Sequence, residues 1–158
     1  MLNTFKITES LIKRKRPKFN FKVYHDTPVS PLSKPLSECR LALITTGGLH
    51  LKTDRPFDLT LSDGDCSYRT LPDKIRPEGL SIAHKWYNHK FIHADLNCVF
   101  PIDRMCEYVK KRTIKSLAEE HYSFMGHIYE TKPLIKSAQK VGDRLKKFNV
   151  DIVFLTPT

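Results

Sequence analysis

The feature that most constrains the fold is a long amphipathic segment followed directly by a short apolar run. Residues 133–148 place the apolar side chains on one face of a helix, at Leu134, Ile135, Ala138, Val141 and Leu145. Pro133 suits the first turn of this helix, and Lys146 and Lys147 lie near its negative end. The run Val150–Leu155 follows at once and predicts a buried strand. A helix joined closely to a buried strand is typical of α/β folds with parallel sheets.

Earlier segments repeat this alternation. Arg40–Thr46 is a nearly continuous apolar run that ends at Gly47-Gly48, which predicts another buried parallel strand. We expect further strands at Leu80–His84 and Ile114–Ala118, and a helix at Ile102–Arg112. The sequence therefore predicts an α/β fold with a mostly parallel sheet and helices on both faces. We expect it to be Rossmann-like or flavodoxin-like, and incomplete at the C-terminus.

Two regions lie outside the alternation. Residues 1–38 combine a basic run, which has no acidic residue between Ser10 and Lys22, with prolines and serines that follow it. We interpret residues 1–38 as a basic, Pro/Ser-rich N-terminal arm and residues 39–158 as one α/β domain. Residues 52–79 are rich in Asp, Pro and Gly and show little periodicity, which predicts a long excursion of the kind that often carries function.

Composition narrows the classes of protein. No apolar run approaches the roughly 18 residues of a membrane span, and the first residues lack the apolar core of a signal peptide. We therefore expect a cytoplasmic protein without a membrane partner. The four cysteines are far apart and form no CxxC motif, which favours reduced thiols, and we expect Cys98 and Cys106 to be buried. The net charge of +10 comes largely from the basic run, which lacks stacking aromatics in a recognised fold, so no nucleic-acid partner is expected.

The predicted topology places the loops that follow the strands close together, because the carboxyl ends of parallel strands share one edge of a sheet. Gly47–His50 follows the first strand, His84 ends the second, Glu119–His127 follows the third and Thr156–Thr158 follows the last. Of the seven histidines, all but His25 lie in or near these loops. We therefore expect a polar, histidine-rich crevice along this edge.

Motifs in these segments occur in a distinctive order. They are Thr45–Lys52, Pro56–Asp58, Asp63–Arg69, Asp95–Arg104 and His121–His127. This series resembles the selenoprotein B family of the glycine, sarcosine, betaine and D-proline reductases, with the D-proline branch the nearest, from about Pro35 to Thr158. In that family a strand like Val150–Leu155 leads into a loop that holds selenocysteine, or cysteine in its place. We expect that residue directly after Thr158. Two explanations for the end of the chain stay open: a selenocysteine codon was read as a stop codon, or the sequence is a gene fragment.

The resemblance implies reductive cleavage of a carbon–nitrogen bond α to the carboxylate of an amino acid or amine. A partner subunit with a pyruvoyl group would activate the substrate, a selenolate or thiolate would attack the α-carbon, and a dithiol reductant would resolve the adduct. No cofactor would lie in this chain, which is expected to be inactive by itself. Candidates for supplying a positive field or a proton are His50, His84, His121 and His127. Candidates for binding the substrate are Thr45, Thr46, Gly47, Gly48, Asn97, Asp103 and Arg104.

Alternatives remain open at this point. Asn97, Asp103 and Arg104 equally suit a loop-to-helix transition with a cap and a surface ion pair. A metal site is conceivable from His84, His89, His93, Asp95 and Cys98. Their spacing does not match a zinc-finger pattern, so we expect no metal. The alternative function is a non-catalytic α/β binding or scaffolding protein that uses its basic N-terminal arm.

Overall fold

The chain divides into two units in the computed structural model. The structure describes residues 4–18, 20, 21, 23, 25–27, 29–85 and 87–158. Contacts within the chain separate a first unit, Met1–Pro31, from a second, Leu32–Thr158. The first unit contains helix α1, Thr4–Lys15, which the sequence analysis did not predict. Its last turn is basic, which suits the negative end of a helix, and none of its described side chains is buried.

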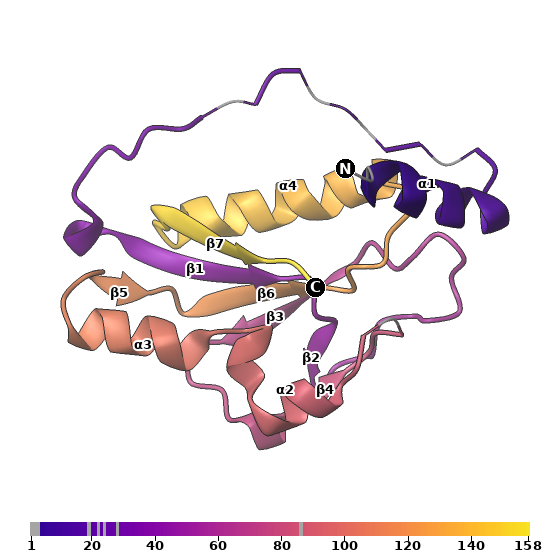
Figure 1. The fold of residues 1–158 in the computed structure, drawn as a ribbon. Helices are drawn as coiled ribbons and strands as arrows, with labels where there is room; N and C mark the ends of the chain where they lie inside the picture. Colours follow the sequence, from indigo (N-terminus) through magenta and orange to yellow (C-terminus); the bar gives the residue numbers. More distant parts are fainter. Residues whose placement is uncertain (1–3, 19, 22, 24, 28, 86) are drawn as a thin grey trace. The chain divides into compact units, whose positions relative to one another are not determined.

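The second unit is built around a five-stranded, mostly parallel sheet (Figure 1). Its strands are β1 (Arg40–Thr45), β3 (Tyr68–Pro72), β5 (Ser116–Leu117), β6 (Glu120–Phe124) and β7 (Ile152–Thr156). Strand β1 is central: it pairs in parallel with β7 on one side and with β5 and β6 on the other. Strand β3 pairs antiparallel with β6. This confirms the predicted α/β class, although the strands are too few to define a Rossmann-like sheet.

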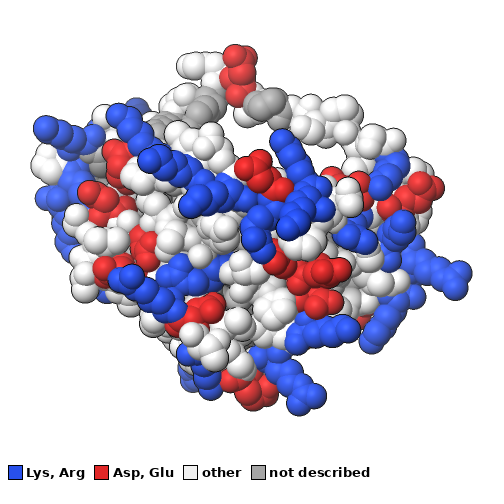
Figure 2. Space-filling model, turned by 180° about the vertical axis from the view of Figure 1, so that it is seen from behind, with Lys and Arg blue, Asp and Glu red and all other residues white. Residues whose placement is uncertain are grey.

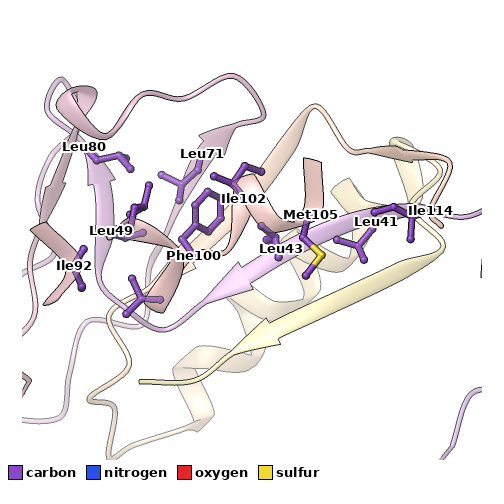
Figure 3. Packing of buried hydrophobic residues seen from close by; sticks show 12 residues of the cluster. Leu41, Leu43, Leu49, Leu71, Leu80, Ile92, Phe100, Ile102, Met105 and Ile114 are labelled. Carbon is purple, nitrogen blue, oxygen red and sulfur yellow. The ribbon is translucent and has the colours of Figure 1, made fainter. Parts of the chain in front are cut away.

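Helices α3 (Ile102–Lys110) and α4 (Lys132–Lys147) lie on opposite faces of this sheet (Figure 1). On the α3 face, Leu41 and Leu43 of β1 belong to one buried apolar cluster with Met105 of α3 (Figure 3). On the other face, the guanidinium of Arg144 in α4 pairs with the carboxylate of Glu120 in β6. The two predicted helices are confirmed, with ends that differ by one or two residues.

A smaller sheet extends the core. Strands β2 (Leu49–Leu51) and β4 (Leu80–Ile82) pair antiparallel, and helix α2 (Lys90–Ala94) is close in sequence to the short 3₁₀ helix η3 (Leu96–Cys98). Further 3₁₀ turns are η1 (Leu36–Glu38) and η2 (Pro77–Gly79). Buried side chains of β2, β4, α2 and η3 belong to the same apolar cluster as those of β1 and α3. The second unit therefore has one main core.

Several predictions for individual segments are wrong. Residues 52–79 were expected to form an excursion, yet they contain β3, whose pairing with β6 places it in the main sheet. Glu119–His127 was expected to be a loop, yet its first half is β6, since its polar side chains find partners inside the fold. The predicted strand Leu80–His84 forms β4 but joins the small antiparallel sheet.

Strand β7 is at the predicted place but is not buried. Among the described residues it pairs only with β1, so it lies at the edge of the main sheet. Val153, Phe154 and Leu155 are 36%, 42% and 65% exposed. An apolar run predicts burial from its composition alone, whereas the exposure of β7 follows from its place at the edge.

Two findings bear on charge and on membranes. Figure 2 shows Asp and Glu side chains interspersed among the Lys and Arg side chains on one face of the molecule, so the positive charge is not continuous there. In the part of the chain that the structure describes, no helix is long and apolar enough to cross a membrane.

Candidate functional site

The ends of three parallel strands are joined at one edge of the main sheet. The backbone N–H of Thr46, after β1, donates to the carbonyl of Thr156 in β7 at 3.1 Å. The N–H of Thr158 donates to the hydroxyl of Thr46 at 2.9 Å. The N–H of Gly48 donates to the carbonyl of Phe124 in β6 at 2.9 Å. We call this region, residues 46–48, 125–127 and 156–158, the carboxyl edge, and the label C marks it in Figure 1.

Two glycines allow these loops to approach one another. Gly48 has a φ of +67°, and a Cβ there would lie 2.5 Å from the carbonyl oxygen of Ala83. Gly126 has a φ of +85°, and a Cβ there would overlap the carbonyl oxygen of Thr46. Side chains at these positions would meet both backbone strain and a steric clash. The contact between loops therefore depends on glycine.

His84 lies directly against the carboxyl edge. Its Nε2 is 3.1 Å from where a Cβ on Gly126 would be, and its own side chain is 6% exposed. Burial lowers the pKa of His84 to about 4, helped by the positive charges of His127 and His89. The imidazole is therefore neutral near pH 7, and it can accept or pass a proton more readily than it can supply a fixed positive charge.

Tyr87 connects His84 to the glycine loop. The two rings lie 4.6 Å apart, and the Tyr87 hydroxyl donates to the carbonyl of Gly47 at 2.6 Å. Burial, with a smaller contribution from Cys98, raises the pKa of Tyr87, so the phenol keeps its proton. No role for Tyr87 follows from the sequence, because a single aromatic residue in a loop carries no periodic signal.

His127 occupies the loop after β6. Its charge acts on His84, and its ring packs edge-on against Tyr129 with centroids 4.5 Å apart. The N–H of Tyr129 donates to the carbonyl of Asp63 at 2.9 Å, which ties this loop to the segment between β2 and β3. That segment therefore lies beside the carboxyl edge.

The other two candidate histidines are held elsewhere by buried contacts. The Nδ1 of His50, in β2, lies 2.8 Å from the carbonyl oxygen of Leu51. His121 is fully buried in β6, and its Nδ1 accepts a hydrogen bond from the N–H of Leu43 at 3.0 Å. Burial lowers the pKa of His121 to about 4 against the raising effect of Asp73. Of the four histidines, the structure thus brings two, His84 and His127, to the carboxyl edge.

The segment Thr45–Gly48 uses its polar groups to hold the loop. The hydroxyl of Thr45 accepts from the N–H of Gly47 at 3.0 Å. The N–H groups of Thr46 and Gly48 donate to β7 and β6 as described above. Binding of a substrate carboxylate by these donors stays a prediction, since each of them already has an acceptor inside the protein.

Asp103 and Arg104 lie in the first turn of α3, and Asn97 lies in η3 just before it. The side-chain oxygen of Asn97 accepts from the N–H of Asp103 at 3.1 Å, and its amide donates to the Asp103 carboxylate at 2.9 Å. Arg104 forms an exposed ion pair with Glu107 at 2.8 Å. These contacts match the alternative interpretation, a loop-to-helix transition with a cap and a surface ion pair. Binding of substrate by these residues stays a prediction.

The four cysteines are free thiols that differ in burial. The expectation that Cys98 is buried is wrong: it ends the surface helix η3 and is exposed, while Cys106 is half-buried. Val99 directly follows Cys98, and its carbonyl accepts a hydrogen bond from the hydroxyl of Thr156 at 2.8 Å. The end of η3 therefore lies next to the end of β7. Within the described ranges, no group of three or more His, Cys, Asp or Glu side chains could hold a metal ion.

These features define a class: a mixed α/β domain whose loops after the parallel strands meet at an edge that carries glycines and histidines. The family described as glycine/sarcosine/betaine reductase selenoprotein B matches residues 14–158. The chain therefore belongs to the selenoprotein B family of these reductases, as the motifs predicted.

Curated relatives carry the names of reductase subunits. The chain is 34% identical to D-proline reductase subunit gamma of Acetoanaerobium sticklandii, over 80% of this chain and 52% of that protein. It is 30% identical to glycine reductase complex component B subunit gamma of Symbiobacterium thermophilum, over 83% of this chain and 31% of that protein. It is 26% identical to sarcosine reductase complex component B subunit beta of Peptoclostridium acidaminophilum, over 86% of this chain and 32% of that protein. The chain thus spans about half the length of the first relative and about a third of the other two. No solved structure gives a significant match.

Proposed function

We propose that this chain is part of a subunit of an amino-acid reductase complex that cleaves a carbon–nitrogen bond, as the names of its relatives suggest. One observation carries the proposal. The N–H of Thr158 is bound to the hydroxyl of Thr46 at the carboxyl edge, close to the loops of Gly48 and Gly126. Residues that follow Thr158 in a longer product would start at this edge, where ligands bind in open α/β sheets.

The proposed nucleophile is a selenocysteine, or a cysteine in its place, that follows Thr158. When present, it would supply an ionised selenol or thiol that attacks the α-carbon, while a pyruvoyl group on a partner subunit would activate the substrate amine. The residues of the carboxyl edge fit such a group. Thr46 holds the backbone that leads to it, and Gly48 and Gly126 let the neighbouring loops pack closely around that point.

The proposed reaction balances as a two-electron reduction. The carbon–nitrogen bond breaks, a carbon–hydrogen and a nitrogen–hydrogen bond form, and a dithiol is oxidised to a disulfide. In this scheme the neutral imidazole of His84 carries a proton to or from the reacting groups, because its pKa of about 4 keeps it uncharged near pH 7. Tyr87 holds the loop of Gly47 through its hydroxyl, and the ring of Tyr87 packs against the ring of His84.

The first test is the nucleotide sequence after codon 158. An in-frame TGA followed by coding sequence with a nearby cysteine codon is expected. An ordinary terminator or unrelated sequence would count against the reductase and favour the non-catalytic binding protein with its basic arm.

The second test is activity of the extended chain together with its pyruvoyl partner subunit, a dithiol, and D-proline or glycine. We expect turnover by the extended chain and none by residues 1–158 alone. Replacement His84→Gln in the extended chain should lower kcat roughly 100-fold, the lower end of what a general acid–base residue contributes. The matched control is His25→Gln, which replaces an exposed histidine of the first unit. Equal rates for His84→Gln and the unaltered chain would remove His84 from the mechanism.

A further inference from the structure

A pocket outside the carboxyl edge lies between the small sheet and helix α2. It has a volume of about 490 Å³, within the range of small-molecule sites. Its floor is apolar and buried, formed by Leu49, Leu80, Ile92 and Leu96. Figure 3 shows Leu49, Leu80 and Ile92 in the same part of the core. The floor can therefore take up a short apolar group.

The mouth of the pocket carries ionisable side chains. They are Lys52, Glu78, His89 and His93. In the described residues no hydrogen bond or ion pair joins any of these four side chains to another protein group. The Nε2 of His89 is buried and lacks a hydrogen-bond partner. Buried polar atoms are normally paired, so an unpaired one beside a pocket points to a group that the pocket receives.

The fold places opposite charges side by side at this mouth. The N–H of Lys52 donates to the carbonyl of Gly79 at 3.0 Å, so Lys52 lies across the small sheet from the turn that carries Glu78. His89 and His93 are four residues apart and line the same pocket from the α2 side. A ligand with one negative and one positive group would satisfy both Lys52 and Glu78.

We propose that this pocket binds an α-amino acid with a short apolar side chain. The carboxylate lies toward Lys52, the ammonium toward Glu78, and the side chain lies over the apolar floor. The imidazole of His89 supplies a further hydrogen bond to the carboxylate through its otherwise unpaired Nε2.

Tyr87 links the pocket to the carboxyl edge through ring contacts. The ring of His89 packs on Tyr87 at 4.9 Å, and Tyr87 packs on His84 at 4.6 Å. An amino acid in the pocket is therefore one aromatic ring away from the histidine of the proposed active site. The choice of an amino acid as ligand rests on the proposed function, whereas its binding needs no nucleophile and can be measured on residues 1–158.

The test is titration of the purified 158-residue protein with alanine, 2-aminobutanoate and norvaline, followed by calorimetry and by ¹H–¹⁵N NMR. Each added methylene should tighten binding about fourfold, because it is buried on the apolar floor. Pentanoate and pentylamine, which each lack one charged group, should bind about tenfold more weakly than norvaline. Amide shifts should concentrate at Leu49, Ser81 and Ile92.

Variants of the mouth give the second arm of the test. Lys52→Gln and Glu78→Gln replace exposed side chains, so the fold should persist, and each should weaken norvaline binding about tenfold. Lys140→Gln on α4 is the matched control and should change nothing. Absence of saturable binding, no dependence on chain length, or unchanged affinity in both charge variants would each overturn the proposal. Norvaline binding without reductase activity in the extended chain would refute the proposed function alone, and activity without norvaline binding would refute the pocket alone.

Discussion

At the scale of single residues, His121 completes the sheet where strand pairing is interrupted. Strand β1 pairs with β5 at Leu41 and with β6 at Ile44, which leaves the N–H of Leu43 between the two registers. The Nδ1 of His121 accepts that hydrogen bond. A donor buried without an acceptor would cost about 1–3 kcal/mol, so this histidine has a structural task in the core.

Two buried histidines make stability depend on pH. The pKa values of His84 and His121 are lowered from 6.5 to about 4. Between these two pH values the two histidines are protonated in the unfolded chain but neutral in the folded chain. Stability is therefore full above pH 6.5 and falls as the pH drops from 6.5 toward 4. We expect each histidine to account for about 2 kcal/mol of lost unfolding free energy between pH 7 and pH 5. Urea denaturation across this range measures the loss.

The variant His121→Gln isolates one of the two contributions. A glutamine oxygen can still accept from Leu43 but does not titrate, so about half of the pH-dependent loss should disappear. An identical pH profile for this variant would show that His121 is protonated at the same pH in the folded and unfolded states.

Gly48 is the residue on which the loop after β1 depends most. Gly48→Ala would require a left-handed backbone for a residue with a Cβ, which costs about 1–2 kcal/mol, and would add a clash with the carbonyl of Ala83. We expect a loss of at least about 2 kcal/mol in unfolding free energy. Gly142→Ala is the matched control: it lies in α4 with no atom near its Cβ, and it should stabilise by about 0.5–1 kcal/mol. Equal effects of the two substitutions would contradict this account.

At the scale of elements, the sequence predicted the helices α3 and α4 but missed the helix α1 and the strand β6. The helices α3 and α4 were found because their apolar side chains recur with the helical period. Strand β6 was missed because Glu120, His121 and Ser123 give it a polar composition. Their partners, Arg144 for Glu120 and Leu43 for His121, come from segments far away in the chain, so no local pattern could reveal them.

The link between α4 and β6 depends on one charged pair. The carboxylate of Glu120 receives two N–H groups of Arg144, one of them at 2.8 Å, and the Tyr122 hydroxyl at 3.1 Å. Arg144→Ala should lower unfolding free energy by about 1–2 kcal/mol, and Arg144→Lys should recover only part, because lysine lacks the planar fork. Lys140→Ala, one turn earlier and exposed, should stay within about 0.5 kcal/mol of the unaltered protein. Thermal and urea unfolding distinguish these outcomes.

At the scale of the whole molecule, the two units should differ in their contribution to stability. The core and the carboxyl edge lie within Leu32–Thr158. A variant that lacks residues 1–31 should therefore unfold with the same midpoint and the same denaturant dependence as the full chain. A lower midpoint would show that the N-terminal arm contributes to the folded core.

The site was predictable only in part for a related reason. Motif order identified the family, and the rule for parallel strands placed the loops of Thr46 and Thr158 at one edge. The same rule could not tell which histidines reach that edge. His84 follows a strand of the small antiparallel sheet and not of the main sheet. His121 is buried because it lies within strand β6, where the composition predicted a loop.

The open side of β7 has a consequence for handling the protein. Its backbone groups and the side chains of Val153, Phe154 and Leu155 form a surface on which another molecule can add a strand and propagate. Refolding yield should therefore fall steeply as protein concentration rises, and fibrous precipitate should form first in solutions of high salt, where repulsion between cationic molecules is screened. A charge placed in the middle of this strand, as in Phe154→Lys, should delay that growth.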